Sequence, residues 1–378
     1  MEKIKIVYIV DAFAVWGGIE RVLADKINYL IGYYGYEVCL LTVNQGTHSM
    51  PYILHPNVQQ MDLGIQMHQQ YNYHGIKRLL RRRDLKKLLV FKLMEAIDKF
   101  SPDIIICVKL DFVGVLLAVK GTAPLVVECH TLCKSDALEG SGLLRRLHSI
   151  YWKLLLRKAN AVVALTEGDA AAWKRWNRNV FVIPNVVNLN NHSSVSDCRN
   201  KSAIFVGRFS MQKDIDNLLR IWGLVSEKYP EWQLDIYGDG ELREHYLPMI
   251  NEMGANVRVF APIADIMEKY RGNSILLLTS LYEPFGLVLP EAMSCGLPVV
   301  AFDCPYGPAD IITDGVDGFL VGNRSIETFA QRVCQLIESD DLRRQMGQAG
   351  MLSSQRYQVE RIMPMWKELF ENLVFSRA

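Results

Sequence analysis

The feature that most constrains this chain is a repeated alternation of short β-branched runs with helix-length segments. Most of the predicted strands in the first half are separated by helix-length segments, and such an alternation indicates a parallel sheet covered by helices. The first half is therefore expected to form a doubly wound α/β domain. Its predicted strands are Ile4–Val10, Glu37–Val43, Asp103–Val108, Pro124–Cys129, Ala161–Leu165 and Val180–Ile183.

A polar linker, within residues 188–201, precedes a second series of the same kind. We predict an N-terminal domain of residues 1–187 and a C-terminal domain of residues 188–357, with a last helix, about 358–378, that packs back on the first domain. Ligands of such sheets bind outside the strand carboxyl ends, so a cleft between two facing domains is the expected site. The second set of predicted strands is Ala203–Val206, Leu234–Tyr237, Val257–Phe260, Ser274–Thr279 and Pro298–Phe302.

Composition narrows the protein class. Apolar residues make up 50% and charged residues 22% of the 378-residue chain, which is the balance of a folded protein. The longest apolar runs, such as Phe112–Val119, fall far short of the ~18 residues of a transmembrane helix, and the N-terminus lacks a signal-peptide pattern. Eight scattered cysteines favour reduced thiols and a cytoplasmic location over disulfides or a zinc site.

Positive charge is concentrated in the first half. Residues 1–190 hold 24 Lys/Arg against 16 Asp/Glu, a net +8, although the whole chain carries only +1. Seven basic residues, among them Arg81, Arg82 and Arg83, lie between Lys77 and Lys87. An anionic membrane surface is the favoured partner, a solvated helix face is the alternative, and a nucleic acid does not suit the motifs described below.

Apolar residues around this basic cluster do not share one helical face. Ile76, Leu79 and Leu80 lie on one side of an ideal helix, whereas Leu85, Leu88 and Leu89 lie on the other. We therefore predict a break near Arg83, with Asp84 as the N-cap of a helix running to Phe100. A second stripe, along the helix predicted at 143–159, is expected to be explained by core packing; its residues are Leu143, Leu144, Leu147, Ile150, Tyr151, Leu154 and Leu155.

The strongest chemical signal is the segment Glu283–Glu291, which follows an apolar strand and precedes the stop signal Gly296–Pro298. Gly286 lets the backbone approach a ligand closely, and a helix beginning near Leu287 would direct free N–H groups toward a phosphate. Glu291, one turn into that helix, can reach a diol such as a ribose.

Three weaker signals lie at other predicted strand ends. Arg208 and Lys213 follow a strand and suit a diphosphate. Gly17–Gly18 forms a strand-to-helix turn, and His130 follows the strand Pro124–Cys129. Each alone is explained by a solvated loop, a common turn or a structural histidine, but their joint order along one chain is much less common.

In these segments the chain resembles the retaining GT-B glycosyltransferases of family 4 over nearly its whole length. Glu283 and Glu291 look like that family's E-x7-E motif, and Val206–Arg208 with Lys213 looks like its diphosphate-binding segment. The family often has glycine where this chain has Asp214 and Val186.

The resemblance implies two Rossmann-like domains and a nucleoside diphosphate sugar donor. Arg208 and Lys213 would hold the diphosphate, Glu291 the ribose, and Glu283 with the Phe285–Leu287 backbone the sugar, beside His130. The acceptor would be a glycan or a lipid-linked glycan. A UDP-sugar is the first expectation and GDP-mannose the second, because Asp303–Pro308 looks like the segment of members that use UDP-hexoses.

Mechanistic expectations follow from the same comparison. Fixed cations at the leaving diphosphate supply the charge that a metal would supply elsewhere, so we expect no metal, no Asp-x-Asp metal site and no other cofactor. The resemblance implies front-face displacement with retention, in which the leaving phosphate accepts the acceptor's proton.

Three other functions remain open. A nicotinamide oxidoreductase would need G-x-G-x-x-G, and Arg243 stands where the third glycine would follow Gly238 and Gly240. A nucleotide-sugar epimerase shares the two-domain plan and the donor. A catalytically inactive binding subunit is the non-enzyme alternative.

Overall fold

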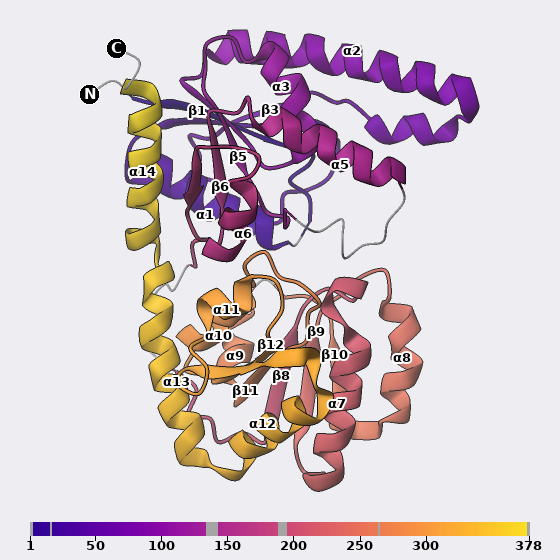
Figure 1. Ribbon diagram of the computed structural model, residues 1–378, viewed down its shortest axis with the longest axis vertical. Helices are drawn as coiled ribbons and strands as arrows, with labels where there is room; N and C mark the ends of the chain where they lie inside the picture. Colours follow the sequence, from indigo (N-terminus) through magenta and orange to yellow (C-terminus); the bar gives the residue numbers. More distant parts are fainter. Residues whose placement is uncertain (1–2, 16, 134–142, 188–194, 264, 376–378) are drawn as a thin grey trace. The chain divides into compact units, whose positions relative to one another are not determined.

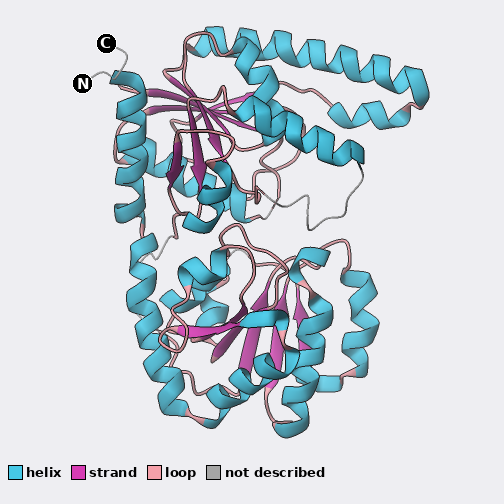
Figure 2. Ribbon diagram, viewed as in Figure 1, coloured by secondary structure: helices cyan, strands magenta, loops and turns pink. Residues whose placement is uncertain are grey.

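Two parallel β-sheets organise the chain in a computed structural model, which describes residues 3–15, 17–133, 143–187, 195–263 and 265–375. The chain forms two compact units: residues 1–186 with 359–378, and residues 187–358. Figure 2 shows that helices and strands alternate in both units. The prediction of two doubly wound α/β domains is confirmed.

The first unit contains a seven-stranded sheet in the order β3-β2-β1-β4-β5-β6-β7. Its strands are β1 Lys5–Val10, β2 Glu37–Thr42, β3 Gln59–Asp62, β4 Ile104–Cys107, β5 Leu125–Glu128, β6 Ala161–Ala164 and β7 Val180–Val182. Its helices are α1 Gly18–Gly32, η1 Met67–Asn72, α2 Gly75–Phe100, η2 Leu110–Phe112, α3 Val113–Val119, α5 Leu143–Leu156, α6 Glu167–Trp173 and α14 Val359–Phe375. The β3 strand was not predicted, because its residues are mostly polar and exposed.

Side-chain alternation along the central strands produces two cores in this unit. One face of the sheet, with Val7 and Ile9, packs under α2, α3 and α6. The other face, with Ile6 and Tyr8, packs under α1 and the C-terminal helix α14. Figure 1 shows α14 beside α1, so the end of the chain completes the cover of the first sheet.

The second unit contains a six-stranded sheet in the order β10-β9-β8-β11-β12-β13. Its strands are β8 Ser202–Val206, β9 Gln233–Tyr237, β10 Val257–Phe260, β11 Ile275–Leu278, β12 Val299–Phe302 and β13 Gly318–Val321. Its helices are η3 Met211–Lys213, α7 Ile215–Lys228, α8 Arg243–Glu252, η4 Gly254–Asn256, α9 Met267–Arg271, α10 Val288–Ser294, α11 Gly307–Ile311, η5 Gly322–Arg324, α12 Ile326–Glu338, α13 Asp340–Ser354 and η6 Gln355–Tyr357. All strand pairs are parallel.

The predicted helix break near Arg83 is wrong. Helix α2 runs unbroken from Gly75 to Phe100, and Asp84 lies inside it rather than at an N-cap. Buried residues begin only at Leu85, so the first ten residues need not present an apolar face to a core. Their Leu, Arg and Lys side chains are good helix formers, which lets the helix continue without a break.

The interpretation of the second apolar stripe also needs correction. On α5 the side chains of Leu147, Ile150, Tyr151 and Leu154 are 54%, 45%, 54% and 45% exposed. Core packing therefore explains only the inner side of this helix, where Leu156 is buried. The side chains of Leu143 and Leu144 lie outside the described residues.

The eight cysteines lie inside the protein, where all of them are free and buried. Within the described ranges, none of the helices combines the length and the apolarity that crossing a bilayer requires.

Candidate functional site

Strand order reverses between β8 and β11, the first pair of neighbours in the second sheet that are not consecutive in the chain. In open α/β sheets, ligands bind at the carboxyl ends of the strands at this switch point. The loop after β8 carries Arg208 and Lys213, and the loop after β11 carries Glu283. The topology therefore brings together residues that stand 70 positions apart.

Lys213 and Glu283 form an ion pair through Nζ and Oε1. The Ser280 hydroxyl donates a hydrogen bond of 2.7 Å to the same carboxylate oxygen. The side chains of Lys213 and Glu283 are 14% and 6% exposed, so the ion pair is largely shielded from water. The Thr279 hydroxyl, which donates to the Lys213 carbonyl at 2.9 Å, ties the two loops together again.

Glycines let the turns after β8 and β9 meet at short distance. A Cβ on Gly238 would lie 1.9 Å from the carbonyl oxygen of Gly207, so only glycine fits there. A Cβ on Gly240 would lie 2.7 Å from Cγ of Arg208. The Arg208 side chain is exposed beside this double turn.

The segment after β11 is fixed by backbone hydrogen bonds around Glu283. Its N–H donates to the Pro305 carbonyl at 2.7 Å, and its carbonyl accepts from Gly307 at 2.9 Å. Gly286 has a φ of +88°, a conformation that favours glycine. Phe285 is buried against the Tyr357 ring, with the centroids 5.2 Å apart.

Helix α10 follows directly, with Leu287 as its N-cap residue. Glu291 is buried in its first turn, and the Tyr270 hydroxyl donates to Oε2 of Glu291 at 3.2 Å. The two glutamates of the E-x7-E segment thus have different partners: Glu283 a lysine and a serine, Glu291 a tyrosine.

The backbone at Asp214 explains why the family often has glycine at this position. Its φ of +50° is left-handed, which is why glycine suits this position. The Asp214 side chain offsets this strain by capping α7 through the Asn217 N–H and by pairing with Arg324.

Arg324 is a residue that sequence reasoning missed. Besides Asp214, its guanidinium donates to the carbonyls of Ser280 at 2.8 Å and Thr279 at 2.9 Å, and it lies 4.4 Å from the Phe302 ring centroid. It braces the loops after β8 and β11 from outside every motif. No local pattern in the sequence marks it.

The expectation of no Asp-x-Asp site overlooked the sequence Asp214-Ile215-Asp216. Both carboxylates serve the fold, because Asp214 caps α7 and Asp216 accepts 2.6 Å from the Tyr246 hydroxyl. Among the residues that the structure describes, no group of three His, Cys, Asp or Glu side chains gathers as metal ligands do.

In the first unit, Gly17 and Gly18 lie where β1 leads into α1, as expected. A Cβ on Gly17 would lie 2.4 Å from a carboxylate oxygen of Glu20, and the Tyr52 hydroxyl donates to the Gly17 carbonyl at 3.3 Å. The structure thus places the glycine loop at a strand carboxyl end, in the same unit as His130.

His130 follows β5 and connects to a buried charge network that the sequence did not reveal. Its Nε2 lies 3.0 Å from Oε1 of Glu128, and its side chain is only 4% exposed. Glu128 is also paired with Lys26 of α1, and both of these side chains are 1% exposed. The Lys26 ammonium lies 4.3 Å from the ring centroid of Trp366 on α14.

Electrostatics keep the Glu128 carboxylate ionised. Burial by itself would raise the pKa of Glu128, but the charges of Lys26 and His130 outweigh it and lower the pKa to about 2. Burial lowers the pKa of Lys26, and Glu128 opposes that shift. Tyr8, which packs on the same ammonium, has its pKa raised well above its usual range by burial and by Glu128.

Comparison with known proteins agrees with this geometry. Residues 16–191 match the family model described as Glycosyltransferase Family 4, and residues 190–352 match that of Glycosyl transferases group 1. The chain belongs to the family-4, group 1 glycosyltransferases of the GT-B fold.

Three similar proteins illustrate this membership. The amylovoran biosynthesis glycosyltransferase AmsD of Erwinia amylovora is 29% identical over 381 residues, which cover 97% of this chain and 99% of AmsD. A TarM variant of S. aureus, solved with UDP, has a TM-score of 0.81 at 17% identity and covers 97% of this chain and 100% of its own. HepE of Anabaena, solved with UDP and glucose, has a TM-score of 0.77 at 20% identity and covers 98% and 100%.

The predicted site residues of this glycosyltransferase fall into three groups. Arg208, Lys213 and the 283–291 segment share the carboxyl edge of the second sheet. Gly17, Gly18 and His130 lie at the carboxyl edge of the first sheet, and Arg81, Arg82 and Arg83 lie on α2.

The buried pair generates a prediction about acid stability. The folded pKa of Glu128 lies below its unfolded value of about 4.5, so its contribution is complete above pH 4.5 and is lost as the pH falls toward 2. The Glu128→Gln variant should lack this part of the acid loss. At neutral pH it should lose about 3–5 kcal/mol, because Lys26 remains buried without its partner.

Urea unfolding followed between pH 2 and 7 measures both effects. Glu128→Gln combined with Lys26→Met should recover most of the neutral-pH loss, since neither charge is then buried alone. A double variant as unstable as Glu128→Gln alone would show that the pair does not carry this energy.

Asp214 gives a second prediction through two matched substitutions. Asp214→Ala loses the helix cap, unpairs Arg324 and keeps the left-handed strain, so it should cost about 2–3 kcal/mol. Asp214→Gly loses the same contacts without the strain and should cost about 1 kcal/mol less. Urea denaturation measures the difference, with Glu227→Ala on the exposed side of α7 as control. Equal stability of the two variants would refute the strain argument.

Proposed function

We propose that this glycosyltransferase transfers a hexosyl or N-acetylhexosaminyl group, with retention, from a UDP-sugar to a glycan or lipid-linked acceptor. Cell-surface polysaccharide or glycolipid synthesis is the proposed setting, and GDP-mannose is the second donor. The observation that carries the proposal is the Lys213–Glu283 ion pair at the switch point, with Arg208 exposed beside it. The names of AmsD, an amylovoran biosynthesis glycosyltransferase, and of TarM and HepE, both solved with UDP, support it.

The leaving diphosphate is the centre of the proposed mechanism. When the bond between the anomeric carbon and the β-phosphate oxygen breaks, negative charge grows on that oxygen, and nearby cations stabilise it. Lys213 and Arg208 supply this charge without a metal. Glu283 holds the lysine before the donor arrives, so little reorganisation is needed at the moment of transfer.

The acceptor oxygen then forms its bond to the anomeric carbon on the face that the diphosphate leaves. Its proton passes to the departing phosphate, so the proposed front-face step needs no enzymic nucleophile. Glu283 and the Phe285–Leu287 backbone would orient the sugar, and Glu291 the ribose. His130, held by Glu128, would lie beside the reactive face of the sugar.

We further propose that the enzyme works at the cytoplasmic face of a membrane, held there by the basic residues of α2. Arg82 and Arg83 are exposed, which suits contact with anionic headgroups. Arg81 is less available, because its guanidinium donates 2.6 Å to the side chain of Gln69. The structure thus favours Arg82 and Arg83 over Arg81 within the predicted cluster.

Donor binding can be tested by thermal shift with UDP, GDP and ADP. UDP should stabilise the protein most. Lys213→Ala and Arg208→Ala should each weaken UDP binding about 10- to 100-fold, the equivalent of a lost charge-assisted hydrogen bond. Lys228→Ala, an exposed lysine on α7, is the control and should bind as the parent does. Stabilisation by GDP alone, or unchanged UDP affinity in both variants, would contradict the proposal.

The two glutamates should have separable effects. Glu291→Ala should weaken UDP itself, because this carboxylate is assigned to the ribose. Glu283→Ala should leave UDP affinity nearly intact and lower kcat, because this carboxylate is assigned to the sugar and to Lys213. Calorimetry with UDP and turnover of UDP-sugars with a glycan acceptor measure the two quantities. Identical phenotypes would refute the division of roles, and donor hydrolysis without any transfer would favour the epimerase alternative.

A further inference from the structure

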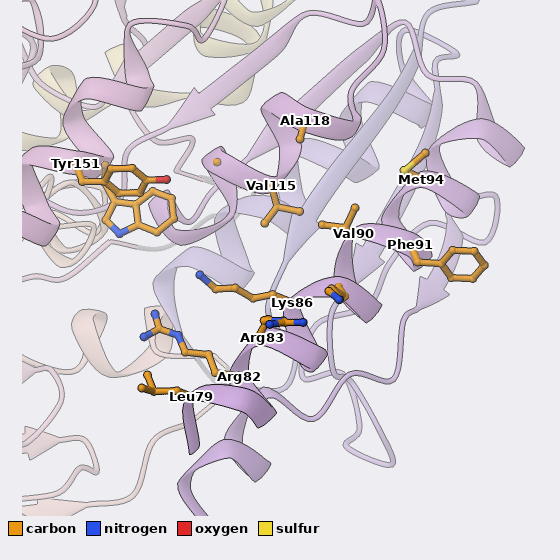
Figure 3. A pocket seen from close by; sticks show the side chains of 13 residues that line it. Leu79, Arg82, Arg83, Lys86, Val90, Phe91, Met94, Val115, Ala118 and Tyr151 are labelled. Atoms are coloured by element: carbon orange, nitrogen blue, oxygen red, sulfur yellow. The ribbon is translucent and has the colours of Figure 1, made fainter. Parts of the chain in front are cut away.

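Helices α2, α3 and α5 of the first unit line an open groove of about 820 Å³. This volume lies within the roughly 300–1,000 Å³ typical of small-molecule sites. Figure 3 shows side chains of all three helices around the groove, with Val90 of α2 and Val115 of α3 facing one another across it. None of the residues assigned to the donor or to catalysis lines it.

The floor of the groove is apolar and is formed by small residues of α3. Gly114, Val115 and Ala118 line it, and Tyr151 and Trp152 of α5 close one side. A Cβ on Gly114 would lie 3.1 Å from Cζ3 of Trp152, so glycine lets the indole pack directly on α3. A slender apolar group fits such a floor better than a polar one.

Cations line the opposite side of the same groove. Arg82, Arg83, Lys86 and Lys87 all contribute, and no Asp or Glu lines the groove among the residues that the structure describes. Figure 3 shows Arg82, Arg83 and Lys86 following one another along α2. Four positive charges, with no carboxylate in the described lining, favour an anionic occupant.

Exposed apolar residues of α2 and α5 extend the apolar surface beyond the floor of the groove. Leu79 and Phe91 of α2, which line the groove, are 63% and 65% exposed. On α5, Leu147, Ile150 and Leu154 extend the apolar surface. An ordinary solvated basic face does not carry so much exposed apolar surface, whereas a surface that contacts lipid does.

We propose that this groove binds one membrane lipid whose head carries a phosphate, with its hydrocarbon chain on the α3 floor and its phosphate against Arg82, Arg83 and Lys86. The apolar floor complements the hydrocarbon chain of such a lipid, and the adjoining cations complement its phosphate. This inference deepens the proposed membrane association and rests on it. It differs by requiring a stoichiometric site instead of diffuse attraction to a charged surface.

The test uses the full chain and a monoacyl glycerol phosphate kept below its micelle concentration, with binding measured by calorimetry. One molecule should bind per chain. A monoacylglycerol of the same chain length, which lacks the phosphate, and inorganic phosphate, which lacks the chain, should each bind at least about tenfold more weakly.

Two groove variants and one control locate the site. Ala118→Phe fills the floor at an exposed position, where the larger ring need not disturb the core, and Arg82→Gln with Lys86→Gln removes two cations. Each should weaken binding at least about tenfold. Lys77→Gln with Lys99→Gln removes the same charge from exposed positions of α2 outside the groove and should bind as the parent does.

A spectroscopic measurement checks the position of the chain directly. A lipid with a brominated chain should quench tryptophan fluorescence, and Trp152→Phe should remove most of that quenching although six other tryptophans remain. Quenching that persists in Trp152→Phe would place the chain elsewhere and overturn the proposal.

Sedimentation with anionic vesicles separates this inference from the wider proposal. Vesicle binding that Ala118→Phe leaves intact, without 1:1 binding of the free lipid, would overturn the groove and keep membrane association. Absence of vesicle binding together with absence of lipid binding would overturn both. UDP stabilisation, measured in the same variants, should be unchanged, because the groove lies outside the residues assigned to the donor.

Discussion

The meeting of two strand ends, those of β8 and β11, governs the second unit. A parallel sheet places both carboxyl ends at one edge, and the reversal of strand order leaves room for a ligand between their loops. Bringing Lys213 and Glu283 together there buries two opposite charges, which is favourable only when both are present. Ser280 and Arg324 then hold the loops in the arrangement that this pair requires.

The first unit also contains a pair of opposite charges, and this pair is buried more deeply. Lys26, from a helix, neutralises Glu128 at the end of β5, and Trp366 of the C-terminal helix covers the ammonium. Oε1 of Glu128 in turn lies 3.0 Å from Nε2 of His130. The surroundings of His130 thus depend on a helix that joins this unit only after the second sheet is complete. Removal of α14 would expose the Lys26–Glu128 pair to water.

The strands and the E-x7-E segment could be predicted from sequence because their signals are local. Alternation of apolar runs specifies β1 or β11 without knowledge of their neighbours, although the polar strand β3 and the short strand β13 were not predicted. The pairings could not be predicted, since Lys26 and Glu128 are 102 positions apart and Arg324 belongs to no motif. The predicted break in α2 was wrong because it assumed that apolar residues on a helix must share a buried face.

That error concerns the energetics of α2 itself. Ile76, Leu79 and Leu80 are 75%, 63% and 51% exposed, so the first turns of α2 gain little from burial. Helix propensity and two contacts with η1, the Arg81–Gln69 hydrogen bond and Arg78 over the Tyr71 ring, hold this segment. Apolar side chains on a helical segment that does not pack on the core stay exposed to water, and their hydration is unfavourable. They become an advantage where the segment meets lipid, and the basic residues between them bring it to an anionic surface.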